Sequence, residues 1–402
     1  MIINALLILY ILSPKIGYVD YSVIFVFLSF LLSFRYKSQI QIRIDRSISL
    51  ILLLWVGTIL LSIYSDLYYQ DLNLFFTLKP IRQIILIVLL GIVIKINKIN
   101  FERIVNIIII ASILNSLIVI TQYILHILHI NDSFLLFSNF NSDVLVIFRK
   151  PGTFSGYPTA SMVSLFGIIL MFETKLDKHM ILKIPIIICL IISLILTART
   201  GFVLCILYLL YFTVKEVKNV KKLILILCSL SLLFLFLINI NKIGILHKDT
   251  INVMFEFIIE KKFSTRSTDS LIESYKSLPQ NVSTIFIGNG LFMKSDDEHV
   301  SGIGNATVDV GFQIYFFGNG ILYLFLILLL YGLYFRLSLY RLTNKKVKRL
   351  FIILYGILFL SSLKGDFLFS RGFPDQLLIL TLVMYYEKKI IKNTMCDYRI
   401  RV

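Results

Sequence analysis

The 402-residue chain has little charge and few cysteines. Charged residues make up 16% of it and hydrophobic residues 58%, whereas soluble domains have about a quarter charged and about half apolar residues. With a mean hydropathy of +0.87, this composition excludes most classes of soluble enzyme and indicates a membrane protein. The 4 cysteines are too few and too scattered for a disulfide framework, so we expect free thiols packed as small hydrophobic groups.

Signals of several other functions are missing as well. The sequence has no Walker A string, no defensible Ser-His-Asp order, no Gly/Ser linker and no internal repeat. His126, His129 and Asp132 are spaced three apart, but no further ligands complete a tetrahedral site. We therefore expect neither a metal nor a cofactor. The N-terminus lacks the charged and cleavable parts of a secretory signal, which indicates a retained first span.

The apolar runs predict an all-α polytopic membrane protein, organised as one helical domain over residues 1–402. A transmembrane helix needs roughly 20 mainly apolar residues, and somewhat shorter runs are tolerated. By this measure we expect about twelve transmembrane helices. The predicted intervals are 2–13, 18–34, 48–63, 81–96, 104–125, 158–173, 180–197, 200–214, 222–238, 308–335, 350–363 and 374–386.

The distribution of charge predicts the orientation. Most of the 40 Lys and Arg residues fall in alternate connecting segments and in the C-terminal tail, and most of the 23 acids fall in the other segments. Basic segments stay on the cytoplasmic side, so we expect both termini in the cytoplasm and a multi-pass protein of the cytoplasmic (inner) membrane. This arrangement explains the net charge of +17 without nucleic acid. The basic segments should face anionic membrane lipids.

One large external loop, residues 239–307, separates the ninth and tenth predicted spans and is too long for a simple connection. Residues 251–259 repeat apolar side chains at helical spacing, which predicts a short amphipathic helix on the membrane surface. A second helix over 266–278 would carry Arg266 and Glu273 on its polar stripe. We interpret the loop as an extracytoplasmic cap.

A few cations break the charge rule on the outer side, namely Arg149, Arg199, Arg266, Lys364 and Arg371. A charge at the edge of an apolar bundle is costly, and an anionic partner would account for it, because guanidinium matches phosphate in a bidentate way. Arg199 could instead be a snorkelling anchor of a tight hairpin. Arg149 lies just before a helix expected to begin at Pro158, which suggests an anion site, although an ordinary re-entrant turn is the alternative.

The entry into the tenth span also carries an acid. Asp309 begins an apolar segment, and Gln313 follows one turn later on the same face. Gly311, Gly318 and Gly320 would keep this helix slim for close packing. A carboxylate here could pair with one of the arginines or accept a proton.

Taken in order, these passages resemble the Wzy-type O-antigen and capsular-polysaccharide polymerases of the O-antigen ligase superfamily. The matching pieces are Gly-Thr-Phe at 152–154 between Arg149 and Pro158, Ala-Arg-Thr-Gly at 198–201, Phe-x-Gly-x-Gly at 286–290 after Arg266, and Asp-x-Gly at 309–311 followed by Gly318. Span number and cap position agree as well, so the resemblance covers most of the chain.

The resemblance implies a metal-independent membrane glycosyltransferase. Such an enzyme transfers glycan from one undecaprenyl-diphosphate-linked chain to another lipid-linked repeat at the outer face of the cytoplasmic membrane. Arg149, Arg199 and Arg266 would stabilise the diphosphate leaving group, with Lys364 and Arg371 as further substrate-binding candidates. The resemblance also implies a flippase and a chain-length regulator as partners.

The transferase needs a general base for the acceptor hydroxyl. Asp309 is the first candidate, His299 the second and Glu273 the third, although Glu273 also reads as a surface charge on an amphipathic helix. Two other functions stay open: a ligase-type transferase, and a flippase or secondary transporter of lipid-linked oligosaccharide. No internal repeat relates the two halves of the chain, which disfavours a transporter. A scaffold protein would not explain arginines at several outer span ends.

Overall fold

The structure is a computed structural model, and it describes residues 1–12, 14–16, 19–35, 45–69, 74–128, 152–154, 157–175, 180–216, 282–288, 311–340, 342–368 and 370–400. These residues belong to two compact units. Unit 1 comprises Met1–Phe25, Val105–Phe263 and Arg371–Phe373, and unit 2 comprises Val26–Ile104, Ser264–Ser370 and Pro374–Val402. Of the predicted cap, the structure describes only residues 282–288. The division into one membrane domain and a cap therefore stays a prediction.

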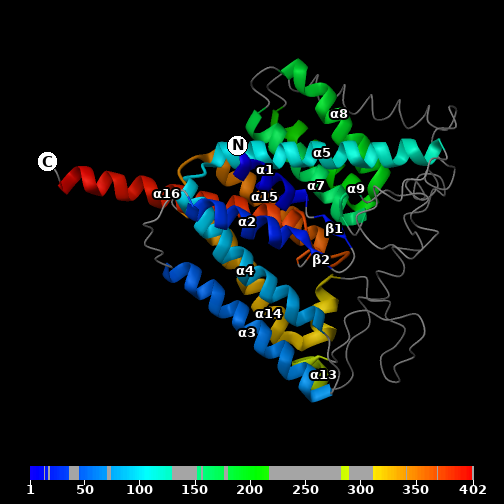
Figure 1. Cartoon of the computed structure of the whole chain (residues 1–402). Coiled ribbons are helices and arrows are strands. Elements are labelled where there is room, and N and C mark those ends of the chain that lie inside the picture. The colour runs from blue at the N-terminus through cyan, green and yellow to red at the C-terminus, as the bar shows by residue number, and fades with distance from the viewer. Residues whose placement is uncertain are drawn as a thin grey trace. The chain divides into compact units, whose positions relative to one another are not determined.

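Unit 1 is built around helix α7. Its helices are α1 (Ile2–Leu12), most of α5 (Phe101–Ile127), α7 (Tyr157–Leu170), α8 (Met180–Thr197) and α9 (Arg199–Glu216). A π-helical turn, Met171–Lys175, continues α7, and α7 packs against both α8 and α9 (Figure 1). A small hairpin pairs β1 (Lys15–Ile16) with β2 (Val19–Asp20) in antiparallel register.

Unit 2 contains four long helices. They are α3 (Arg46–Tyr69), α4 (Leu74–Asn97), α14 (Gly311–Leu339) and α16 (Phe373–Ile400), with most of α2 (Tyr21–Arg35) and the whole of α13 (Val282–Ile287) and α15 (Lys345–Ser362). Helix α3 packs against α4 and α14, and α13 and α15 also pack against α14 (Figure 1). The indole N–H of Trp55 on α3 donates to the Tyr334 hydroxyl on α14 over 2.7 Å.

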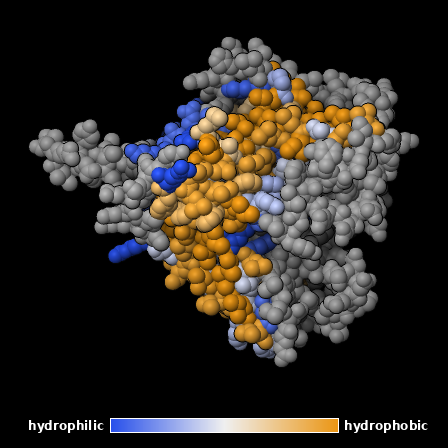
Figure 2. Space-filling model, in the orientation of Figure 1, coloured by the Kyte–Doolittle hydropathy of each residue, from blue (hydrophilic) through white to orange (hydrophobic). Residues whose placement is uncertain are grey.

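The surface of α3 has the polarity expected for contact with lipid. Its exposed stripe is apolar and includes Leu53 at 67%, Leu60 at 62% and Leu67 at 72% exposure. Its buried face carries Thr58, Ser62, Ser65 and Asp66 instead. Figure 2 shows the resulting hydrophobic surface over the region of α3 and α4. A soluble helix has the opposite arrangement, with its apolar stripe facing the core, so this face of α3 belongs in a hydrocarbon environment.

Helix α5 repeats this pattern in unit 1. Leu114, Leu117 and Ile124 are exposed, while the polar side chains of Ser112, Asn115, Ser116 and Gln122 are completely buried. The hydroxyl of Ser112 donates to the Val163 carbonyl on α7 over 3.0 Å. The hydroxyls of Ser116 and Ser164 lie 3.1 Å apart. Hydrogen bonds made by small polar side chains thus join α5 to α7, as is common for helices packed within membranes.

The described residues agree with the prediction of an all-α membrane protein. The two short strands β1 and β2 are the exception. Four helices are long and apolar enough to cross a bilayer: Arg46–Tyr68, Phe76–Asn97, Phe101–Leu125 and Gly311–Leu339. Shorter apolar helices cover Ile2–Leu12, Tyr21–Arg35, Pro158–Thr174 and Lys183–Thr197. Every predicted interval except 222–238 contains a described helix, and 222–238 lies outside the described residues.

The largest difference from the predicted boundaries is at the end of α16, which extends to Ile400 instead of residue 386. The next largest is at α4, which begins at Leu74 instead of residue 81. The sequence Lys79-Pro80 suggests a helix start, yet Pro80 lies inside the helix. Proline has no N–H to donate to the carbonyl four residues earlier, which here belongs to Phe76. The hydroxyl of the buried Tyr323 donates to that carbonyl instead, over 3.4 Å. A side chain of α14 thereby takes over one lost hydrogen bond of α4.

Candidate functional site

The Gly-Thr-Phe segment forms a buried turn held by two amide side chains of α5. The N–H of Gly152 donates to Oε1 of Gln122 over 3.0 Å, and Nε2 of Gln122 donates to the Gly152 carbonyl over 3.1 Å. Oδ1 of Asn115 accepts from the N–H and from the hydroxyl of Thr153. The Thr153 hydroxyl also lies 2.7 Å from the Leu12 carbonyl on α1, so the turn joins three parts of unit 1.

This geometry explains the residue types in the turn. Gly152 has a φ of +64°, and a Cβ there would lie 2.3 Å from Oδ1 of Asn115, so only glycine fits. Threonine supplies both a backbone and a hydroxyl donor to the same amide oxygen. Phe154 is buried in a cluster with Ala160 and Val163 of α7. The turn is therefore fixed against the N-terminal half of α7.

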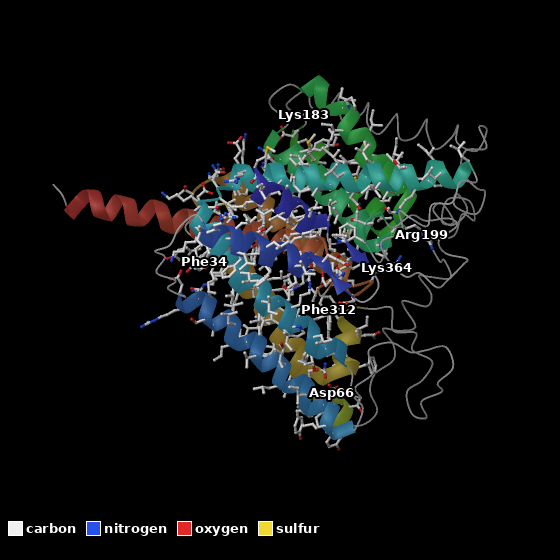
Figure 3. The ribbon with its side chains drawn as sticks, viewed as in Figure 1. Phe34, Asp66, Lys183, Arg199, Phe312 and Lys364 are labelled. Carbon is white, nitrogen blue, oxygen red and sulfur yellow. The ribbon has the colours of Figure 1, made fainter. Side chains whose placement is uncertain are left out.

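The Ala-Arg-Thr-Gly segment follows α7 in the sequence and contacts the same part of that helix. Ala198 separates α8 from α9, and Arg199 is the first residue of α9 (Figure 3). A Cβ at Gly201 would lie 2.6 Å from Oγ and 3.0 Å from the backbone carbonyl carbon of Ser161. Glycine thus permits α9 to approach α7 closely. The result places the start of α9, with Arg199, beside the first turns of α7.

Arg371 is brought to α7 in the same way. Gly372 has a φ of +88°, and a Cβ there would lie 2.8 Å from Val163, 3.0 Å from Phe154 and 3.1 Å from Thr159. The ring of Phe373 packs edge to face on Phe166 with centroids 4.8 Å apart. The Arg371–Phe373 segment therefore lies along the first two to three turns of α7.

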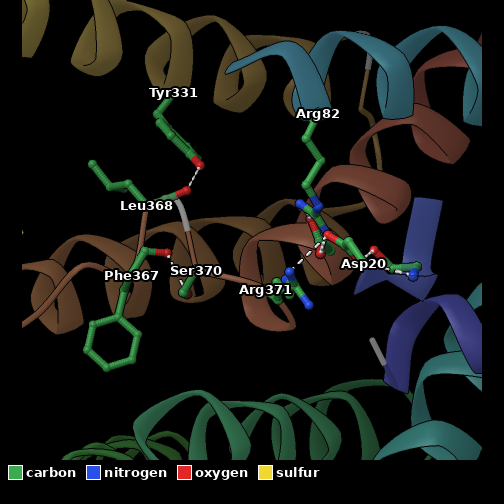
Figure 4. Close-up of polar contacts among 9 residues, drawn as sticks. Asp20, Arg82, Tyr331, Phe367, Leu368, Ser370 and Arg371 are labelled. Carbon is green, nitrogen blue, oxygen red and sulfur yellow. Dashed lines mark hydrogen bonds and ion pairs between the residues drawn. The ribbon is translucent and has the colours of Figure 1, made fainter. Parts of the chain in front are cut away.

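The guanidinium of Arg371 also contacts an acid of the β-hairpin. Nη2 of Arg371 lies 3.3 Å from Oδ2 of Asp20, and Oδ1 of Asp20 accepts from the N–H of Ser22 over 3.0 Å and from its hydroxyl (Figure 4). Both side chains of the ion pair are about one-fifth exposed, 21% for Arg371 and 19% for Asp20. Asp20 therefore orients Arg371 at a position that solvent and solutes can reach.

The chain segments that carry two of the predicted cations, Arg199 and Arg371, thus both lie next to the N-terminus of α7. Their neighbouring glycines contact residues within one turn of each other, Ser161 and Thr159. A helix N-terminus presents N–H groups and a positive partial charge. Two guanidinium-bearing segments and a helix N-terminus in one place suit the binding of a polyanion such as a diphosphate. This convergence is the candidate site.

Unit 2 contains a second polar cluster that the sequence analysis did not identify. Arg82 on α4 forms a bidentate ion pair with Asp375 in the first turn of α16, with N–O distances of 3.0 and 2.5 Å. Asp375 is fully buried. One turn earlier on α4, Nζ of Lys79 lies 2.9 Å from Oδ2 of Asp366. The Tyr315 hydroxyl on α14 donates to Oδ1 of the same carboxylate.

The described residues of the loop before α16, 363–368 and 370, are held by further hydrogen bonds within unit 2. The Tyr331 hydroxyl on α14 donates to the Leu368 carbonyl, and the Ser370 hydroxyl donates to the Phe367 carbonyl over 3.1 Å (Figure 4). Lys364 lies in this loop and is partly exposed (Figure 3). A signal for the cluster was present in the sequence, because a carboxylate beside an apolar run needs a partner. Lys79 and Arg82 are far along the chain from their partners Asp366 and Asp375, so the sequence did not predict which residues pair.

The remaining predicted site residues lie outside the described residues: Arg149, Arg266, Glu273, His299 and Asp309. Parts of their motifs are described. In the Phe-x-Gly-x-Gly segment, Phe286 is on α13 and Gly288 ends it. In the Asp-x-Gly segment, a Cβ on Gly311 would lie 2.1 Å from the Gly365 carbonyl oxygen, so α14 starts in close contact with the 363–370 loop.

Comparison with known proteins gives no match, whether with protein families, with curated proteins or with solved structures.

Proposed function

We propose that this chain is a polysaccharide polymerase that transfers glycan from one undecaprenyl-diphosphate-linked chain to another lipid-linked repeat. The observation that carries the proposal is the meeting of the Gly152–Phe154 turn, the Arg199 segment and the Arg371 segment at the N-terminal half of α7. The first two belong to the four passages on which the resemblance to Wzy-type polymerases rests, and the third carries one further predicted cation. They are far apart along the chain, and lipid-facing helices such as α3 supply the membrane setting.

The proposed reaction needs positive charge where the donor's diphosphate leaves. The bond between the anomeric carbon and the phosphate oxygen breaks, and a bond to the acceptor hydroxyl oxygen forms. Negative charge accumulates on the departing undecaprenyl diphosphate, and preorganised guanidinium groups stabilise it. Arg199 and Arg371 would hold the diphosphate at the α7 N-terminus, with Arg149 and Arg266 as additional ligands. The acceptor proton would pass to Asp309, with His299 and Glu273 as the alternative bases.

The membrane arrangement belongs to the same proposal. We infer about twelve transmembrane helices, both termini in the cytoplasm, and a site at the outer face of the cytoplasmic membrane. The cap over residues 239–307 would cover the site and admit the lipid-linked acceptor. Anionic lipids would meet the basic cytoplasmic segments.

A second candidate, a flippase or secondary transporter of the same lipid-linked oligosaccharide, is favoured by one observation. Helix α14 is interrupted at Gly320, which has φ 78° and ψ 178°. Broken membrane helices are a recurrent feature of transporter binding sites. A ligase-type transferase would share the phosphate site and differ in its acceptor.

The experiment that separates these candidates uses the purified full-length protein. In detergent, with undecaprenyl-diphosphate-linked repeats of the host polysaccharide, a polymerase should produce a ladder of longer lipid-linked chains. In proteoliposomes, a transporter should instead move the labelled lipid between leaflets without changing its length. An Arg199→Ala and Arg371→Ala double variant serves as the inactive control. Transbilayer movement without chain growth would reject the polymerase, and transfer only to a different acceptor lipid would favour the ligase.

A further inference from the structure

The N-terminal end of α15 carries a concentrated positive charge. Four of its first five residues are cations, namely Lys345, Lys346, Lys348 and Arg349. Residues 310–365 contain no Asp or Glu, so neither α14, nor α15, nor the connection between them supplies an acid. Within the described part of the chain, no acid forms an ion pair with Lys345 or Lys348. The charge at these two positions is therefore open to an external anion.

The helix itself does not compensate for this charge. Asn344 is the N-cap of α15, and its Oδ1 accepts from the N–H groups of Lys346 over 2.9 Å and Val347 over 3.5 Å. This cap is a neutral amide, and the first turn contains no acid. A helix N-terminus has a positive partial charge, which favours acids and disfavours cations. An anion bound from outside would therefore stabilise this end of α15.

The exposed face of α15 continues from these cations into apolar residues. Lys345, Lys348, Ile352, Gly356 and Leu360 follow one another every three or four residues, so they lie on one face of the helix. All five are exposed, Ile352 at 49% and Leu360 at 52%. A Cβ on Gly356 would meet nothing within 4 Å, which leaves open space between two larger side chains. A charged end followed by a long apolar part is the polarity of a phospholipid.

The length of the apolar part places the cations at the level of lipid phosphates. Residues 350–362 span about 20 Å at roughly 1.5 Å per residue, whereas the hydrocarbon core of a bilayer is about 30 Å thick. The ring of Tyr355 packs on Phe335 of α14 with centroids 5.2 Å apart, which holds α15 beside a candidate membrane span. A short apolar helix thins the bilayer locally. The thinning draws phosphate groups towards Lys345 and Lys348.

We propose that the exposed face of α15 binds one anionic phospholipid. Its phosphate lies at Lys345 and Lys348, and one acyl chain runs along Ile352, Gly356 and Leu360. Ammonium groups bind phosphate as point charges, and they favour a lipid with net negative charge over a zwitterionic one, whose own ammonium they repel. The expected attraction of basic segments to anionic lipid is diffuse, whereas this site holds a single molecule. The proposal does not depend on the polymerase assignment.

The test measures thermal unfolding of the purified full-length protein in a non-ionic detergent with increasing phosphatidylglycerol, or with phosphatidylcholine of the same acyl chains. The wild type should gain about 3 °C at saturating phosphatidylglycerol and little with phosphatidylcholine. The double variant Lys345→Gln and Lys348→Gln should lose most of this gain. Without phosphatidylglycerol it should unfold no lower than the wild type, because it removes two cations from a helix N-terminus. Native mass spectrometry should show one phosphatidylglycerol fewer retained by this variant.

The matched control is the double variant Arg35→Gln and Arg46→Gln, which removes two exposed cations from the ends of α2 and α3 in the same unit. This control should keep the full response to phosphatidylglycerol. Equal losses in the two double variants would indicate diffuse attraction and overturn the proposal, as would an intact response in Lys345→Gln and Lys348→Gln. An equal gain from phosphatidylcholine, or from inorganic phosphate at constant ionic strength, would also overturn it.

Discussion

The side-chain oxygen of Asn115 accepts two hydrogen bonds from Thr153, one from its N–H at 3.1 Å and one from its hydroxyl at 3.2 Å. Both residues are buried. Through this contact α5 fixes the Gly152–Phe154 turn, and the turn in turn packs on α7. The Gly152–Phe154 turn is thus positioned by a helix that carries none of the predicted site residues.

Replacing Asn115 with alanine should destabilise unit 1 by about 1–3 kcal/mol. The N–H of Thr153 would lose its acceptor, whereas the Thr153 hydroxyl would keep the Leu12 carbonyl. The measurement is thermal unfolding of the purified protein. Ser116→Ala, one residue along α5, is the control, because Ser164 still lies 3.1 Å from the Ser193 hydroxyl in that variant. An equal effect of the two substitutions would contradict the role given to Asn115.

Gly201→Ala should separate α9 from α7. The new Cβ would meet Ser161 at 2.6–3.0 Å, and one of the contacted atoms belongs to the backbone and cannot rotate away. Overpacking of this kind costs about 1–3 kcal/mol, which exceeds the roughly 1 kcal/mol that alanine gains over glycine in a helix. We expect a lower Tm and less polymer.

The matched control for Gly201→Ala is Gly332→Ala on α14. A Cβ at Gly332 meets nothing within 4 Å, so this variant should be neutral or slightly more stable. Adding Ser161→Gly to Gly201→Ala should recover part of the lost stability. A Gly201→Ala protein as stable and as active as the wild type would show that the close approach of α9 has no importance.

The short motifs around Gly152 and Gly201 could be recognised from the sequence because their residue types are dictated by local geometry. A positive φ, as at Gly152, requires glycine, and so does a helix approach in which a Cβ would lie within 3 Å of the neighbouring helix, as at Gly201. Such positions can therefore be recognised in a sequence as glycines within short motifs. Apolar runs likewise located the helices, since lipid-facing stripes such as that of α3 are continuous in hydrophobicity. Arg371 was a candidate from the sequence, but its place beside α7 could not be predicted, because that place depends on tertiary packing.

The ion pairs of unit 2 show the same limit. Lys79 and Pro80 look like a helix boundary, yet α4 continues through them because Tyr323 supplies a donor to the Phe76 carbonyl. With Arg82 thereby inside the helix, its partner Asp375 lies on a different helix. A pairing between residues so distant along the chain has no periodic or local signature. It follows only from the packing of α4 against the start of α16.

Breaking the Arg82 and Asp375 pair should be costly. Asp375 is fully buried and Arg82 is 12% exposed, so removing one partner takes a bidentate ion pair away from a buried charge, at about 3–5 kcal/mol. We expect Asp375→Leu and Arg82→Met each to lower the Tm strongly. The double variant should be less destabilised than either single one, because both charges are then gone. A double variant whose loss equals the sum of the single losses would contradict a direct pairing.

The chain's only tryptophan provides a test of the lipid-facing surface of α3. Trp55 is completely buried, and its indole N–H donates to the Tyr334 hydroxyl. Brominated lipids should therefore quench the fluorescence of the natural protein only weakly. Moving the fluorophore to the exposed stripe with Trp55→Phe and Leu53→Trp should produce strong quenching, since Leu53 is 67% exposed. Equal quenching of the two proteins would show that this face of α3 does not contact lipid.

The proposed polymerase site depends most on Arg199 and Arg371, whose segments lie beside the first turns of α7. The charge-conserving substitutions Arg199→Lys and Arg371→Lys test their role most directly. Lysine keeps the charge but loses the planar fork that binds a diphosphate at two points. The measurement is the length of the polysaccharide made in cells, at matched protein levels, with Arg336→Lys at the exposed end of α14 as control. We expect each site variant to shorten or abolish the polymer, by about tenfold or more in rate, and the control to leave it unchanged. Wild-type chain lengths from both site variants would contradict the assignment of this site.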